Sequence, residues 1–170
     1  MWRAEDGLEG LRYAPDVLRD RVAIGVNRSY GVWVALGLLL PSLASWWWFG
    51  TLAGAARGLI WGGMTRIFLV HNAMWSVASV CHLWGSRPYR TAADDRSRNC
   101  AWLAIPTFGE SWHNNHHAFP TSARHGLEWW QLDINYLLIR LLHRLGAISE
   151  VIVPSAATKA SKTAEVMHGD

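Results

Sequence analysis

Two long apolar stretches lie in the first half of the chain. No charged residue occurs from Ser29 to Ala56, which is enough for one membrane-spanning helix, because a span needs roughly 20 apolar residues. The second stretch, from Leu52 to about Val70, contains Arg57 and Arg66, whose long side chains can carry their charges to the interfaces. The pattern predicts two transmembrane helices. For the second, an amphipathic helix that does not cross the bilayer is the alternative.

The distribution of arginines predicts the orientation of this hairpin. Arginines lie before the first stretch and after the second, whereas the turn between them, Trp48 to Ala53, has none. Because Lys and Arg accumulate on the cytoplasmic side, we predict an integral membrane protein with both termini in the cytoplasm. The net charge of +3 is too small to indicate a nucleic-acid partner, and arginines beside apolar spans favour a lipid surface.

Helical periodicity extends past the second apolar stretch to Trp84. One stripe at helical spacing carries His71 near its start and His82 near its end. We expect His82 to face the histidine-rich run near position 113, whereas His71 fits a hydrogen-bonded core histidine. A further helix is predicted from Pro15 to Asn27, in the polar segment before the first stretch.

The second half of the chain is polar and carries one amphipathic segment. Apolar residues recur at helical spacing from Glu128 to Leu145, which predicts a helix that packs on the domain or lies along the membrane surface. The small, polar residues from Pro154 to Asp170 predict disorder. The expected architecture is therefore all-α. It has a cytosolic segment (1–28), a transmembrane helical hairpin with a cytosolic extension (29–84), a cytosolic histidine-box region with the amphipathic helix (85–152) and a disordered tail (153–170).

The run His113-Asn-Asn-His116-His117 carries the candidate chemistry. Residues i, i+3 and i+4 share one face of a helix, so three imidazoles can converge on one metal ion or on two adjacent ions. Neutral imidazole binds iron, zinc, copper or nickel. The interior asparagines exclude the zinc-protease pattern H-E-x-x-H. A histidine-rich surface turn is the alternative, but a solvated turn does not need the bulky Trp112 and Phe119 that flank the run.

Two segments resemble the membrane-bound fatty acid desaturases. Gly109 to Pro120, with the sequence GESWHNNHHAFP, resembles the third histidine box of that family, and is closest to the bacterial form of the stearoyl-CoA (delta-9) branch. Trp75 to Tyr89 resembles the family segment W-x-V-N-S-x-x-H-x-x-G-x-R-P-[YF]. The resemblance runs from about Tyr13 to Ile152 and corresponds to the C-terminal half of such an enzyme.

The resemblance implies an O2-dependent oxidoreductase that introduces a double bond into an acyl chain at a di-iron centre. The implied iron ligands are His82, His113, His116 and His117, and the implied walls of the acyl tunnel include Met74 and Trp75. The implied partners are the lipid bilayer, an acyl-CoA or acyl-lipid substrate, and an external electron donor. That donor resembles ferredoxin or cytochrome b5 with its reductase.

Several family features are missing from the 170 residues. The family's H-x-x-x-x-H box and its earlier H-x-x-H-H box have no counterpart, and Ala78 occupies a position where the family usually has Asn. The remaining histidines do not pair at ligand spacing; these are His71, His125, His143 and His168. We therefore expect a truncated desaturase that is inactive by itself. The alternatives are a non-catalytic membrane remnant that binds one metal ion or none, and another histidine-box oxygenase such as a hydroxylase.

Overall fold

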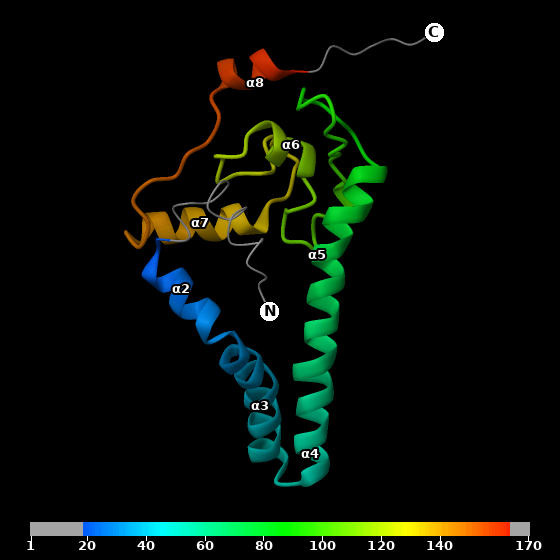
Figure 1. The fold of residues 1–170 in the computed structure, drawn as a ribbon, viewed down its shortest axis with the longest axis vertical. Helices are drawn as coiled ribbons and strands as arrows, with labels where there is room; N and C mark the ends of the chain where they lie inside the picture. The colour runs from blue at the N-terminus through cyan, green and yellow to red at the C-terminus, as the bar shows by residue number, and fades with distance from the viewer. Residues whose placement is uncertain (1–18, 164–170) are drawn as a thin grey trace. The chain divides into compact units, whose positions relative to one another are not determined.

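The computed structural model describes residues 19–163, which divide into two compact units between Phe68 and Leu69. The regular secondary structure of these described residues is helical. They contain isolated β-bridges but no strands, in agreement with the expected all-α class. The first unit contains α2 (Arg21–Arg28), α3 (Tyr30–Phe49) and α4 (Leu52–Arg57), which Figure 1 labels, and then η1 (Gly58–Thr65). The second contains most of α5 (Arg66–Leu83), then η2 (Ala101–Leu103), α6 (His113–Ala118), α7 (Ile134–Arg144) and α8 (Ala156–Lys162).

The helix predicted from Pro15 to Asn27 is present in part. α2 begins at Arg21 because the Asp20 side chain caps it, accepting a hydrogen bond from Val22 N at 2.7 Å. Residues 15–18 lie outside the described part of the chain.

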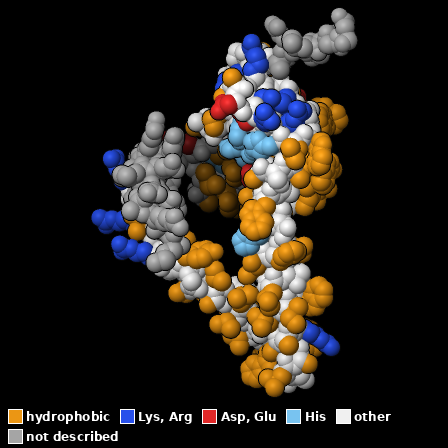
Figure 2. Space-filling view, turned by 45° about the vertical axis from the view of Figure 1, so that its right-hand side comes forward, with side chains coloured by type: hydrophobic (Ala, Val, Ile, Leu, Met, Phe, Trp, Pro, Cys, Tyr) orange, Lys and Arg blue, Asp and Glu red, His pale blue; other side chains and the backbone are white. Residues whose placement is uncertain are grey.

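Helix α3 is the one described helix that is long and apolar enough to cross a membrane. Its 20 residues correspond to about 30 Å of helix, the thickness of a hydrocarbon core. None of its residues is buried within the unit, and Figure 2 shows hydrophobic side chains over α3 and the helical segment that follows it. The second predicted span does not meet the same test, so two transmembrane helices remain a proposal.

Small residues let α3 pack closely against the helical segment that follows it. Ser42 Oγ donates to Ala55 O at 2.9 Å, and Ser45 Oγ donates to Gly54 O at 2.7 Å. A Cβ added to Gly62 would lie 2.6 Å from the Pro41 side chain. Contacts of this kind, together with serine hydrogen bonds, are typical of helix pairs in membranes. The predicted helical hairpin is therefore formed.

The predicted extension of the second helix to Trp84 agrees with the structure within one residue. Helical structure is unbroken through α4, η1 and α5, and it ends at Leu83. The middle part, η1, is π-helical. The last turn of α5 is held within the second unit, because Cys81 is fully buried against Cys100 and Leu103.

The second unit is built from loops that buried side chains hold together. One small core contains Tyr89, Ala118, Phe119 and Leu127. Isolated antiparallel bridges join Asn99 to Ser86 and to Trp112. The Trp112 indole donates to Leu132 O at 2.7 Å. These contacts surround α6.

The predicted boundaries of two segments in this unit differ from those in the structure. The helix expected from Glu128 begins only at Ile134, because residues 128–132 form turns and the Asp133 side chain caps Tyr136 N at 2.9 Å. The tail expected to be disordered contains α8, which Ser155 caps. Residues 164–170 lie outside the described part of the chain.

Candidate metal centre

Two buried asparagines fix the orientation of helix α6. Asn114 is fully buried, and its side chain pairs with the backbone of Tyr89, accepting from Tyr89 N at 3.0 Å and donating to Tyr89 O at 3.1 Å. Asn115 Oδ1 accepts from Asn99 Nδ2 at 2.6 Å, and Asn115 Nδ2 donates to Gln131 Oε1 at 2.9 Å. Because positions 114 and 115 face inward, helical geometry turns positions 113, 116 and 117 to the opposite face.

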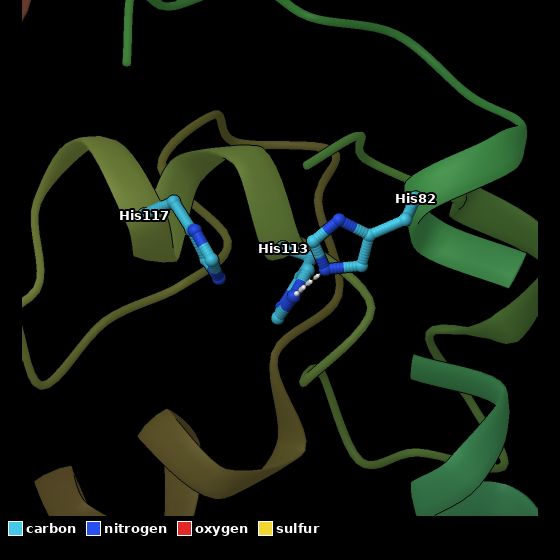
Figure 3. Close-up of side chains that lie close together, drawn as sticks. All are labelled: His82, His113 and His117. Atoms are coloured by element: carbon cyan, nitrogen blue, oxygen red, sulfur yellow. Dashed lines mark hydrogen bonds between the residues drawn. The ribbon is translucent and has the colours of Figure 1, made fainter. Parts of the chain in front are cut away.

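Three imidazoles from two helices meet on that face. The ligand nitrogens of His82, His113 and His117 all lie within 4.8 Å of one another. His82 Nε2 is 3.0 Å from His113 Nε2, and Figure 3 shows the two rings pointing toward each other from α5 and α6. The helical stripe on α5 predicted this approach of His82. We call these residues the three-imidazole cluster. Its spacing is suitable for one metal ion, and imidazole is a good ligand for iron.

Burial keeps the central histidine of the cluster neutral. Desolvation, followed by the neighbouring rings of His117 and His82, lowers the pKa of His113 to about 4. A neutral ring offers a lone pair to a metal at neutral pH. His113 therefore meets the electrostatic requirement of a ligand without further change.

A carboxylate outside the cluster orients His117. Asp95 Oδ1 lies 3.2 Å from His117 Nδ1. Burial raises the pKa of Asp95, but hydrogen bonds from the hydroxyl and backbone N–H of Ser97 outweigh this and hold the pKa at about 2. Asp95 is thus ionised and can accept a hydrogen bond from the Nδ1–H group of His117, which leaves Nε2 of His117 as the metal-facing nitrogen. The sequence offered no spacing signal for Asp95.

The fourth predicted ligand, His116, is not one of the three residues whose ligand nitrogens lie within 4.8 Å of one another. The centre of its ring is 4.6 Å from that of His125, compared with 5.6 Å from that of His117 and 6.1 Å from that of His113. Its Nδ1 is buried and has no hydrogen-bond partner among the described residues. Burial and the nearby His125 lower its pKa. His125 was not expected to pair with another histidine, because only the turn after Pro120 brings it back to α6.

The fatty acid desaturase family model matches residues 5–144. The chain belongs to the fatty acid desaturase family. The sequence resemblance is therefore confirmed. Fatty acid desaturases of this family are membrane-associated and act on acyl chains, which agrees with the apolar helix α3.

The relatives of this desaturase chain are about twice as long as the chain itself. It is 47% identical to a hex-5-enoyl-[acyl-carrier protein] acetylenase of Moorena producens, over 86% of the chain and 45% of that protein. It is 41% identical to an sn-1 stearoyl-lipid 9-desaturase of Anabaena variabilis, over 82% of the chain and 47% of the relative. A delta-9 desaturase-like 4 protein of Arabidopsis thaliana is 50% identical over 66% of the chain and 37% of the relative. The chain thus spans about half the length of these curated relatives.

One of the two residues expected to line the acyl tunnel of the desaturase lies on a groove. The groove has a volume of about 340 Å³ and is mainly apolar. Its lining residues are Val70, Ala73, Met74, Pro106, Thr107, Phe108, Glu110 and Asn135, and we call it the Met74 groove. Trp75 is not among them; it is 66% exposed, and its ring lies 5.8 Å from that of His71.

Proposed function

We propose that this chain supplies histidine ligands to the di-iron centre of a desaturase that introduces a double bond into an acyl chain. In this proposal His82, His113 and His117 bind iron at one position of the centre, and His116 binds iron beside them. The convergence of His82 on α6, from a helix 31 residues away in sequence, carries the proposal. Nothing in a packed core requires three imidazoles at this distance, and neutral imidazole fits iron.

The residues around the cluster have separate tasks. Bound iron supplies the O2-dependent oxidation that removes two hydrogens from an unactivated acyl chain, with electrons from an external carrier. His113 stays neutral through burial, and Asp95 holds His117 in one tautomer. The Met74 groove offers an apolar surface for part of the acyl chain, with Glu110 on its wall. Trp75 does not line this groove, so its contact with the acyl chain is proposed outside the groove.

We further propose that the chain is an integral membrane protein with both termini in the cytoplasm. α3 is the first span, and the segment from α4 to Val70 is the second. The matching relatives differ in their named acyl carriers, since one acts on an acyl-carrier-protein substrate and another on a stearoyl-lipid. The substrate is therefore proposed only as an acyl chain on a thioester or lipid carrier, with a ferredoxin- or cytochrome b5-like donor as the electron source.

Metal analysis of purified variants tests the ligand assignment. The chain in detergent is loaded with Fe(II) without oxygen, and iron per chain is measured by mass spectrometry. His82→Ala, His113→Ala and His117→Ala should each reduce the affinity for iron at least tenfold, because each removes a ligand of one ion. His143→Ala is the matched control, since His143 is exposed and its ring contacts Ile148 O. Equal iron content in all four variants would refute the assignment.

A further inference from the structure

A chain of polar contacts runs from α7 to the histidines of α6. Asn135 Nδ2 donates to Glu110 Oε1 at 2.8 Å. The other carboxylate oxygen of Glu110, Oε2, lies 3.5 Å from His125 Nδ1. The His125 side chain is only 17% exposed, so few other groups can reach that nitrogen. Glu110 therefore favours the His125 ring that carries its proton on Nδ1.

Buried side chains hold the backbone of His125 on both sides. His125 N donates to Asp133 Oδ2 at 2.7 Å, and His125 O accepts from Asn115 Nδ2 at 2.7 Å. Asp133 and Asn115 are both buried. Because Asn115 belongs to α6 itself, the position of His125 is tied directly to the helix that carries His116.

Within residues 19–163, His125 is the nearest aromatic neighbour of His116. Their ring centres are 4.6 Å apart, whereas the ring of His117 is 5.6 Å from that of His116. The rings are tilted by 43°, so the His125 ring covers part of one face of His116. His116 needs such support, because its buried Nδ1 has no partner among the described residues that would fix the ring.

We propose that His125, held by Glu110, is a positioning residue for His116. The inference rests on the proposed role of His116 as an iron ligand. His125 limits the rotation of the His116 ring, so that a nitrogen of His116 already faces the metal position before binding. Loss of an outer partner of this kind typically weakens metal binding by about 10–100-fold. His125 acts through His116 and lies outside the three-imidazole cluster.

The test measures Co(II) binding, because the visible absorption of Co(II) reports the ligand geometry without turnover. The full chain in detergent is titrated as wild type, His125→Leu, His125→Gln and Glu110→Gln. His125→Leu should weaken binding at least tenfold and change the absorption band, whereas the polar His125→Gln should recover part of the affinity. His143→Gln and Glu150→Gln are the controls, since both residues are exposed, and they should match the wild type.

A double-mutant comparison separates positioning from a general structural effect. If His125 acts through His116, His116→Ala combined with His125→Leu should bind Co(II) no more weakly than His116→Ala alone. Additive losses, or a His125→Leu chain that binds like the wild type, would overturn the proposal. If His125→Leu does not fold, Glu110→Gln decides, with an unchanged affinity and spectrum counting against the idea.

The same titrations distinguish this inference from the proposed function. If His82→Ala and His113→Ala lose metal while His125→Leu does not, positioning fails and the ligand assignment stands. If none of the variants differs from the controls, the ligand assignment itself fails.

Discussion

Helix α6 has a structural face, where Asn114 and Asn115 pack into the fold, and a chemical face, which carries the three histidines of the His-Asn-Asn-His-His run. The spacing of the histidines predicted the chemical face, because i, i+3 and i+4 coincide on any helix. The structural face was not predictable, since the partners of Asn114 and Asn115 lie 10 to 25 residues away and no local rule links them. For the same reason the sequence did not indicate His125, which reaches His116 only through a turn.

His113 should make the metal-free chain sensitive to acid. Burial lowers its pKa from 6.5 to about 4, so between these values the unfolded state binds a proton that the folded state does not. Stability is therefore retained above pH 6.5 and is lost as pH falls toward 4. The unfolding midpoint in denaturant, measured from pH 7 to 4, should fall less steeply for His113→Gln than for the wild type. Parallel curves for the two proteins would show that His113 does not carry this dependence.

Helices α7 and α8 begin where a side chain supplies a cap. The apolar periodicity of α7 extends back to Leu127, which is why the sequence favoured a start near Glu128. Asp133 interrupts it, and an Asp before an apolar helical run is itself a start signal. α8 follows the same rule, because Ser155 accepts from Thr158 N at 3.1 Å. Its position also depends on Lys162, which donates to Ala118 O at 2.6 Å, a contact that composition does not reveal.

Asp133 should be the most sensitive cap in this unit. Its carboxylate accepts from Tyr136 N at the start of α7 and from the backbone N–H groups of His125 and Gly126. Asp133→Ala should cost about 1 kcal/mol for the cap and a further 1–3 kcal/mol for the buried donors left without an acceptor. The matched control is Ser155→Ala, which removes a cap alone and should cost about 1 kcal/mol.

Denaturant unfolding followed by tryptophan fluorescence measures both changes. Equal losses in the two variants would mean that the bonds to His125 and Gly126 add nothing. A larger loss for Asp133→Ala should be accompanied by weaker metal binding, because the backbone of His125 is released.

The apolar pattern predicted a helical hairpin, and α3 packs against the helical segment α4–η1 that follows it. The compact units divide between Phe68 and Leu69, so most of α5 belongs to the second unit. The reason is that α5 carries His82 and Cys81, and Cys81 is buried against loop residues of the second unit. Hydrophobicity along the chain predicts an apolar helix but does not show where that helix starts to pack against the loops of the second unit.

The final prediction is that the 170-residue chain binds metal but does not desaturate by itself. The sequence has eight histidines, and only His82, His113, His116, His117 and His125 gather near the cluster among the described residues. The family resemblance implies two further histidine boxes that these residues do not include. Without the imidazoles of those boxes, bound iron would keep open coordination positions, and neighbouring groups would not replace the missing ligands.

The measurement is gas chromatography of products formed with iron, O2, a reducing system and stearoyl-CoA. No monounsaturated product should exceed the level of a His113→Ala control. A chimera that joins to this chain the part of the Anabaena variabilis relative that it does not match should form product, because the family resemblance implies the other two histidine boxes there. His113→Ala in the chimera should abolish the product again. Product from the 170 residues alone would show instead that a second copy or another chain completes the site.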